Sequence, residues 1–359
     1  MQTRHLIDLA DLTLTEWEEL TAMATDIRGH IGDYYGICRG RILATLFYEP
    51  STRTQMSFQT AMLRLGGRII GFDNPANSSV SKGESIKDTV RVVSGYSDII
   101  ALRHPRAGAA TAASLYSRVP VINGGDGGHL HPTQTLTDLA TLKIEKGRLT
   151  GLTIGICGDL LNGRTTHSLI KTMAVFPDNR FILISTPALR IPTYIRALLT
   201  EKDVAFDELD NLSEAMPLLD VLYMTRIQKE RFGSPEQYEA QKGVYVLDKA
   251  KMALAKRDLT VMHPLPRVDE IAYEVDDDPR SKYFQQTEYG LYARMALITR
   301  MLDYPRRAGN SGRAGKFLPE VPVDSGGRCA NPDCITAAEG YLPQMMRGGI
   351  CGYCEHGAQ

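Results

Sequence analysis

Long apolar runs, an N-terminal leader and an excess of charge of either sign are all missing from this sequence of 359 residues. No apolar stretch approaches the roughly 20 residues of a membrane helix, and no basic segment followed by an apolar one opens the chain. The formal net charge of −1 gives no global attraction to nucleic acid or to an anionic membrane. We therefore expect a soluble, cytoplasmic protein with neither nucleic acid nor a membrane as its partner.

The usual nucleotide-binding loops are missing as well. No glycine-lysine-serine or glycine-lysine-threonine sequence is present, so a P-loop is excluded. Residues 155–159 follow a predicted strand and contain two glycines, but they lack the Gly-x-Gly-x-x-Gly spacing of a dinucleotide-binding turn. We therefore expect a site that holds phosphate without binding NAD or using a nucleotide.

Cysteines are few and unevenly spread. Two of the six stand alone, and the other four lie close together near the end of the chain, as Cys329-x4-Cys334 and Cys351-x2-Cys354. This spacing is typical of a four-thiolate zinc site, and in a reducing compartment it favours a metal over disulfides. Zinc and iron remain alternatives, because four thiolates suit both. Four protein ligands leave no open position, so we expect a structural metal.

One stretch predicts a strand, a tight turn and a helix. Residues 42–47 are apolar and have the length of a buried strand, and apolar residues at helical spacing follow Thr52. Ser51 or Thr52 is the expected cap, and Thr52 has capping-box spacing to Gln55. Two hydroxyls and Arg53 at a helix N-terminus make a candidate phosphate site. The alternative is an ordinary capped helix with a solvated arginine, because capping uses the same residue types.

Short apolar runs and helical patterns alternate along most of the chain, which predicts parallel sheets covered by helices on both faces. Strands are expected at 42–47, 68–72, 98–102 and 119–123, and again at 152–157, 181–185, 221–225 and 259–262. The fold class expected is α/β, with two doubly wound parallel-sheet domains, the active site between them, and a small C-terminal zinc-ribbon-like module. The expected boundaries are 1–132 completed by a helix at 283–304, then 133–282, a linker at 305–327 and the module at 328–359.

Unusual residues gather where the predicted strands end, which is where open parallel sheets bind ligands. These residues are Arg53, Arg103, His131, Arg164, Arg226 and the pair Pro264-Leu265. Any single arginine is most simply explained by a local carboxylate partner. Four of them at strand ends are better explained by an anionic ligand, because uncompensated positive charge in a cleft is costly. His131 suits a buried core, but its place between a glycine-rich loop and a helix start favours a polar site.

Six motifs, in order and at matching spacing over residues 1–304, resemble the catalytic chains of the aspartate carbamoyltransferase family. They are Ser51-Thr52-Arg53-Thr54, Arg103-His104-Pro105, His131-Pro132-Thr133-Gln134, Gly163-Arg164-Thr165, Met224-Thr225-Arg226-Ile227-Gln228 and His263-Pro264-Leu265-Pro266-Arg267. The related ornithine enzymes normally carry His-Cys-Leu-Pro and Ser-Met-Gly motifs. Here the first is replaced by residues 263–266 and the second is absent, and the loop Lys82-Gly83-Glu84 also favours aspartate.

The resemblance implies transfer of a carbamoyl group from carbamoyl phosphate to the amine of L-aspartate, in pyrimidine synthesis, by a homotrimer with active sites shared between neighbouring subunits. Carbamoyl phosphate is implied to contact Ser51, Thr52, Arg53, Thr54, Arg103, His131, Gln134, Pro264 and Leu265. L-Aspartate is implied to contact Lys82, Arg164, Arg226 and Gln228. The implied catalytic residues are Arg53, Thr54, Lys82, Arg103 and His131. Lys82, with Ser78 or Ser79, would come from the neighbouring subunit. Transfer to another amino acid and a non-catalytic scaffold are the competing hypotheses.

The tail resembles a second protein of the same enzyme system. Residues 329–336 and 351–355 are similar to the zinc domain of the regulatory chain, with a shortened middle loop and without the nucleotide-binding half. This resemblance implies one structural zinc bound by Cys329, Cys334, Cys351 and Cys354, and no cofactor for catalysis. It also implies a module that packs on a catalytic chain. Whether that chain is its own or a neighbour, and whether a higher assembly results, is left open.

Overall fold

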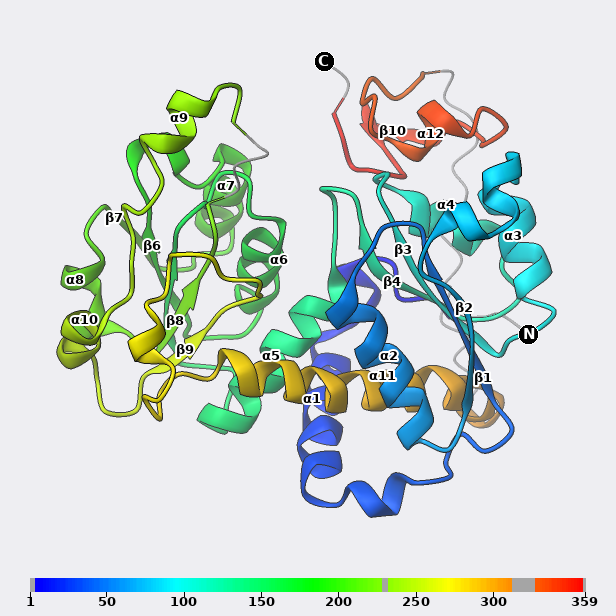
Figure 1. Ribbon diagram of the computed structural model, residues 1–359, viewed down its shortest axis with the longest axis horizontal. Coiled ribbons are helices and arrows are strands. Elements are labelled where there is room, and N and C mark those ends of the chain that lie inside the picture. Colours follow the sequence, from blue (N-terminus) through cyan, green and yellow to red (C-terminus); the bar gives the residue numbers. More distant parts are fainter. Residues whose placement is uncertain (1–3, 228–231, 312–326, 358–359) are drawn as a thin grey trace. The chain divides into compact units, whose positions relative to one another are not determined.

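The computed structural model describes residues 4–227, 232–311 and 327–357 (Figure 1). The chain forms two compact units. The first unit comprises Met1–Leu136 and Gly290–Gln359, and the second comprises Thr137–Tyr289. The chain passes from one unit to the other within helix α5 (Pro132–Lys146) and again within helix α11 (Tyr283–Ser311).

The first unit is built on a four-stranded parallel sheet with the order β2-β1-β3-β4. Its strands are β1 (Ile42–Phe47), β2 (Arg68–Phe72), β3 (Ile99–His104) and β4 (Val121–Asp126). Its helices include α1 (Leu14–Gly29), α2 (Thr52–Arg64), α3 (Ile86–Val93) and α4 (Ala109–Tyr116). The two central strands are buried along nearly their whole length, as expected for apolar runs covered on both faces. The chain leaves β1 toward β2 on one side and returns to β3 on the other, so β1 and β3 form a topological switch point.

The second unit repeats this architecture with five parallel strands in the order β7-β6-β5-β8-β9. They are β5 (Thr153–Cys157), β6 (Arg180–Ile184), β7 (Phe206–Leu209), β8 (Val221–Met224) and β9 (Thr260–Met262). The helices are α6 (Arg164–Met173), α7 (Thr193–Glu201), α8 (Leu212–Ala215), α9 (Pro235–Glu239) and α10 (Lys249–Leu254). Here the switch point lies between β5 and β8. The predicted class of two parallel-sheet α/β domains is therefore confirmed.

Two helix ends can be compared with their predictions. Helix α2 begins at Thr52, which confirms Ser51 as the N-cap out of the two expected residues, and the capping box from Thr52 to Gln55 does not form. Within the described residues the Ser51 side chain makes no capping hydrogen bond, and the start of α2 is held instead by the backbone bond from Gln55 N–H to the Ser51 carbonyl. Helix α11 runs to Ser311 instead of ending at residue 304. A proline removes one helical hydrogen bond but does not end a helix that is well packed before it.

The tail forms a small module over residues 327–357, with α12 (Ile335–Ala338), β10 (Met346–Arg347) and β11 (Ile350–Cys351). It packs on α3 and α4 of its own chain, above the sheet of the first unit (Figure 1). The apolar contact joins Ile335, Leu342, Met345 and Tyr353 of the module to Ile86, Val90, Ala107, Ala109, Ala110, Ala112 and Ala113. In the part of the chain that is described, no helix combines the length and apolarity needed to cross a membrane.

Candidate functional site

The first group of predicted site residues lies at the switch point of the first unit. Ser51 ends the turn between β1 and α2, residues 52–54 form the start of α2, and Arg103 lies near the end of β3. Gly124 and Gly125 lie near the end of β4. Because the three strands are parallel neighbours, their carboxyl ends meet at one edge of the sheet.

Two arginines, Arg53 and Arg103, influence each other electrostatically at this edge. Arg103 is nearly buried, and it donates to Glu49 Oε1 at 2.9 Å and to the Gly124 carbonyl at 3.3 Å. Burial and the nearby Arg103 guanidinium lower the pKa of Arg53. Arg103 thus has the local carboxylate partner expected of an ordinary arginine, yet its charge still acts on Arg53. An anion between the two arginines would relieve this repulsion.

The two glycines near the end of β4 bring the other side chains together. A Cβ added to Gly125 would lie 2.7 Å from Arg103 Nη1 and 3.4 Å from His131 Cδ2. A Cβ on Gly124 would lie 3.7 Å from Thr54 Cγ2. Thr54, Arg103 and His131 are only 7 %, 8 % and 6 % exposed. These three side chains, from separate segments, therefore lie close to the Gly124-Gly125 pair, which has no side chains of its own.

His131 lies directly before Pro132, the first residue of α5. Its Nδ1 lies 3.3 Å from Thr133 Oγ1, and its carbonyl accepts from the Gln134 N–H at 2.9 Å. The Gln134 side chain is half-buried in the same turn. His131 is therefore a buried histidine held by polar partners, as its sequence context predicts.

Lys82 lies apart from this buried group, on an exposed loop. It ends the short 3-10 helix Ser79–Lys82, and Gly83 follows with a left-handed φ of 88°. The Ser78 hydroxyl donates to the Pro75 carbonyl at 2.8 Å and accepts from the Val80 N–H at 3.3 Å. Ser78 is thus engaged inside the loop.

The second group of predicted residues lies at the switch point of the second unit. Arg164 is the first residue of α6, after the turn that leaves β5, and Arg226 follows β8 by two residues. Gly158, with a φ of 125°, lies so close to Thr225 that a Cβ would overlap its carbonyl. The Thr225 hydroxyl accepts from the Asp159 N–H at 3.1 Å and so fixes the two turns to each other.

Arg226 lines a pocket in the second unit that carries charge of both signs. Its walls include Gly158, Thr225, Arg226, Ile227, Tyr238, Lys242, Gly243, Tyr245, Val268, Asp269 and Glu270. Gln228, the remaining residue predicted to contact aspartate, lies outside the described residues. Sequence reasoning did not predict Asp269 and Glu270 as part of this pocket. The signal that could have indicated them is their position just after the motif at residues 263–267.

His263 anchors the loop that carries Pro264 and Leu265. Its Nδ1 accepts from the Leu265 N–H at 2.8 Å, and its Nε2 lies 2.7 Å from Glu270 Oε1. Nδ1 must be unprotonated to accept, so Nε2 carries the proton and donates to Glu270. Leu265 has a left-handed φ of 53°, unusual for a residue with a side chain. Sequence reasoning missed His263 as the residue that holds this backbone in place.

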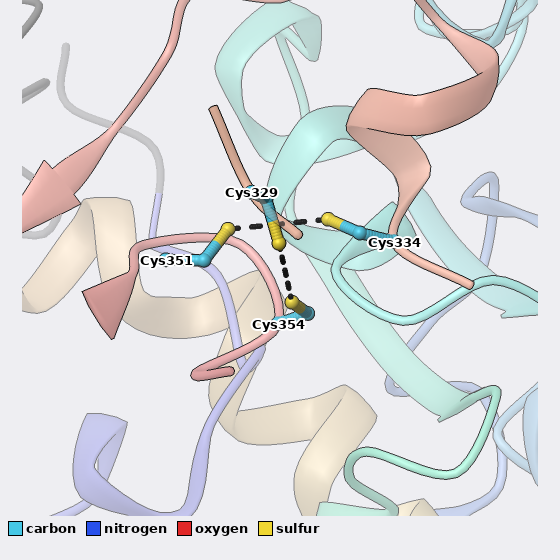
Figure 2. Close-up of side chains that lie close together, drawn as sticks. All are labelled: Cys329, Cys334, Cys351 and Cys354. Carbon is cyan, nitrogen blue, oxygen red and sulfur yellow. Dashed lines mark hydrogen bonds between the residues drawn. The ribbon is translucent and has the colours of Figure 1, made fainter. Parts of the chain in front are cut away.

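The four tail cysteines form a compact cluster (Figure 2). Their sulfur atoms all lie within 4.8 Å of one another, with Cys329 and Cys354 3.5 Å apart and Cys334 and Cys351 3.9 Å apart. Tetrahedral zinc with bonds of about 2.3 Å separates its sulfur ligands by about 3.8 Å. The donor set and its spacing therefore fit a zinc ion.

Two protein-family models match the chain. Residues 4–144 match the carbamoyl-P binding domain of aspartate/ornithine carbamoyltransferases, and residues 150–301 match their Asp/Orn binding domain. The chain is 56 % identical over 303 residues to the aspartate carbamoyltransferase catalytic subunit of Clostridium perfringens, covering 84 % of this chain and 99 % of the relative. It is 54 % identical over 302 residues to that of Clostridium kluyveri, with the same two coverages.

Solved structures agree with these matches. The catalytic subunit of M. jannaschii aspartate transcarbamoylase is 46 % identical, with a TM-score of 0.80 over 85 % of this chain and 99 % of that one. The Trypanosoma cruzi enzyme, solved in complex with carbamoyl phosphate and aspartate, is 37 % identical, with a TM-score of 0.77 over 83 % of this chain and 96 % of that one. Both family models end before the tail module begins.

Proposed function

Because the chain belongs to the aspartate/ornithine carbamoyltransferase family, we propose that the residues at the carboxyl edge of each sheet bind its two substrates. The chain is a carbamoyltransferase that moves the carbamoyl group of carbamoyl phosphate to the amine of L-aspartate. The products are N-carbamoyl-L-aspartate and phosphate, and the reaction belongs to de novo pyrimidine synthesis.

The observation that carries the proposal is the set of fixed donors around Gly125. The phosphate is held by the backbone N–H groups and hydroxyls at the start of α2, together with Arg53 and Arg103. Burial, and after it the nearby Arg103 guanidinium, lowers the pKa of Arg53, and an anionic ligand at this place would offset both effects. The full carbamoyl-phosphate set is Ser51, Thr52, Arg53, Thr54, Arg103, His131, Gln134, Pro264 and Leu265.

No covalent intermediate is needed for the chemistry. Thr54, Arg103 and His131 surround the carbamoyl oxygen, where negative charge grows as the amine attacks the carbonyl carbon. Gln134 and the carbonyls of Pro264 and Leu265 hold the carbamoyl NH2. The tetrahedral intermediate then expels phosphate, which can accept the proton of the amine. His131 acts as a neutral hydrogen-bond donor, and binding both substrates in place makes the reaction effectively unimolecular.

Positively charged side chains recognise aspartate. Arg164 and Arg226 each take one carboxylate, with Gln228 nearby, and Lys82 adds a third positive group. The pocket beside Arg226 supports this assignment, because it also contains Lys242 and the acidic side chains that an amine would favour.

We further propose a homotrimer in which the loop with Lys82, and Ser78 or Ser79, enters the neighbouring subunit's site. Met56 and Leu63 lie seven residues apart on α2, on one helical face, and are 61 % and 54 % exposed. Exposed apolar side chains of this size support an interface there. Lys82→Ala and Arg53→Ala should each be inactive alone and partly active when their subunits are mixed. Background activity after verified subunit exchange would exclude a shared site.

The tail is proposed to hold one structural zinc through Cys329, Cys334, Cys351 and Cys354, and to resemble the zinc domain of the regulatory chain. Thiolate ligation of this kind suits a reducing compartment, which supports a cytoplasmic location. The functional domain boundaries stay predictions: 1–132 with 283–304, 133–282, and 328–359 after a linker at 305–327. Any higher assembly through the tail also stays a prediction.

One assay tests the reaction. Carbamoyl phosphate is supplied with aspartate, ornithine or other amines, and phosphate release is followed. We expect release with aspartate and not with ornithine. Release with ornithine alone would make the chain a transferase for another amino acid, and no release with any amine would make it a scaffold.

A further inference from the structure

The tail module contacts the first unit at three segments that each lie next to a predicted site residue. The Ala107 N–H donates to the Asp333 carbonyl at 3.0 Å, and the Ile335 N–H donates to the Ala107 carbonyl at 2.9 Å, just after β3 and Arg103. Glu339 accepts from the Ile86 N–H at 3.1 Å, at the start of the helix that follows the Lys82 loop. The third segment is the loop between β4 and His131.

Gly108 allows the module to approach the first unit closely. Gly108 adopts a left-handed φ of 80°, and a Cβ there would lie 2.6 Å from the carbonyl carbon and oxygen of Tyr353. A side chain at this position would therefore collide with the module backbone. The close approach places residues 353–355 directly over the segment that follows Arg103.

The loop that leads to His131 is organised around Asp126, which is buried. One carboxylate oxygen of Asp126 accepts from Asn123 Nδ2 at 3.0 Å and from the Leu130 N–H at 3.1 Å. The other accepts from the Gly108 N–H at 2.8 Å and lies 3.2 Å from His129 Nδ1. Asp126 therefore ties the docking segment to the residues on both sides of His129.

Glu355 of the module closes this network from outside. Its Oε2 lies 3.5 Å from Nε2 of His129, so the imidazole stands between two carboxylates. Burial alone would lower the pKa of His129, but its contacts with Asp126 and Glu355 raise it to about 10. Asp8 also faces Glu355, and burial together with that neighbour raises the pKa of Asp8 to about 6. At neutral pH His129 is a cation held by charge on both ring nitrogens.

The backbone at Glu355 argues that its side chain matters. Glu355 has a left-handed φ of 54°, directly after Cys354. Residues with a side chain rarely adopt this conformation, whereas glycine adopts it freely. A glutamate at a position where glycine fits best indicates that the carboxylate offsets the strain through its contact.

We propose that Glu355 is a positioning residue for carbamoyl transfer. It fixes His129 against Asp126, and so fixes the loop that presents Gly125 to Arg103 and carries His131. The inference rests on the proposed function, since the loop matters only if His131 and Arg103 stabilise the carbamoyl oxygen. The module then helps to position the residues of the site, in addition to any structural role.

The test compares full-length, zinc-loaded wild type with Glu355→Gly and Glu355→Gln. We expect kcat to fall about fivefold in both, in the range seen when a remote coupling residue is changed. The Michaelis constant for aspartate should change less than twofold, because the arginines proposed to bind it belong to the other unit. Glu355→Gly removes the backbone strain, so its melting temperature and zinc content should equal or exceed those of wild type. A purely structural role cannot lower kcat while stability is kept.

Asp333→Asn is the matched control, because it removes the same charge from an exposed side chain of the docked module and should leave kcat unchanged. His129→Gln should reproduce the loss of Glu355→Gln, and the double variant should lose no more than either single one. Wild-type kcat in both Glu355 variants, or additive losses in the double variant, would overturn the proposal. If Glu355→Gly loses zinc, Glu355→Gln decides alone, since it keeps the length of the side chain. Wild type that fails to use aspartate would instead reject the proposed function itself.

Discussion

The two units place arginines at the same point of the same kind of sheet, but they hold them differently. In the first unit Arg103 lies inside a strand, is nearly buried and is fixed by Glu49 and the Gly124 carbonyl. In the second unit Arg164 and Arg226 are half-buried and lie beyond the strands, at a helix start and in a turn. Topology sets where a charged group appears, and local packing decides how firmly it is held.

The surroundings of the arginines differ in the same way. In the first unit two arginines, Arg53 and Arg103, lie near the Gly124-Gly125 pair, and Glu49 pairs with only one of them, Arg103. This excess of positive charge suits a phosphate group. The pocket of the second unit contains Arg226 and Lys242 together with Asp269 and Glu270. This mixture suits a ligand that has carboxylates and an amine, as an amino acid does.

The largest expected effect comes from removing one arginine of each kind. Arg103→Ala should lower kcat by about 10²–10³, because it removes a fixed donor to the carbamoyl oxygen. Arg226→Ala should weaken the binding of aspartate by roughly 2–5 kcal/mol, because one carboxylate of aspartate is left unpaired. The binding of carbamoyl phosphate should change far less. Steady-state kinetics and calorimetric titration with each substrate separate the two losses.

If Arg226→Ala lost the same affinity for both ligands, Arg226 would be a structural residue, and the proposed difference between the two units would be wrong. Asp276→Asn is a useful control in the second unit. It frees Arg267, which pairs with Asp276 and stacks on Tyr273, without touching either proposed substrate. It should lower stability and spare both binding constants.

A smaller effect is expected from filling the glycine loop of the first unit. Gly125→Ala places a methyl group 2.7 Å from Arg103 Nη1, so the guanidinium or His131 must move. Displacing groups that must be held to within about 0.5 Å should lower kcat/KM by about 10². Gly147→Ala is the control, because Gly147 also has a positive φ but nothing lies within 4 Å of its added Cβ. Similar kinetics in the two variants would show that backbone strain, and not crowding at the site, sets the loss.

Metal removal should give the smallest change, and it should affect only one unit. A strong chelator removes the proposed zinc, so the module loosens from α3 and α4. A stability loss of about 1–2 kcal/mol lowers the melting temperature by roughly 2–8 °C. Hydrogen exchange should increase in residues 86–93 and 109–116 and stay unchanged in residues 164–173. Cys351→Ser should show the same pattern without chelator. Uniform exchange across both units would contradict selective support by the module.

The sequence predicted most of what lies on the long apolar strands and at their ends. Residues 42–47 match β1 at both ends, because a buried run is followed at once by a polar turn. Arg103 and Arg226 were placed correctly at strand ends for the same reason. Strand β7 (Phe206–Leu209) was missed, because an edge strand with the sequence Phe-Asp-Glu-Leu has no continuous apolar signal.

Features made by small residues were not predictable. Helix α4 (Ala109–Tyr116) is rich in alanine and buried nearly all round, so it shows no amphipathic period. That same alanine surface receives the tail module, and no motif marks it as a docking face. His129 was overlooked because one of its two carboxylate partners, Glu355, lies far from it in the sequence and reaches it only through the docked module.

The split of the first unit between Met1–Leu136 and Gly290–Gln359 has a consequence for synthesis on the ribosome. The first part of that unit leaves the ribosome early, but α11 and the module that complete it are made last. Residues 137–289, a single continuous segment, take roughly 8–30 s to be made at about 5–20 residues per second. During that interval the apolar face of α4 has no cover from its own chain. The α4 surface that the module covers is therefore left without this cover on the nascent chain until the last residues emerge.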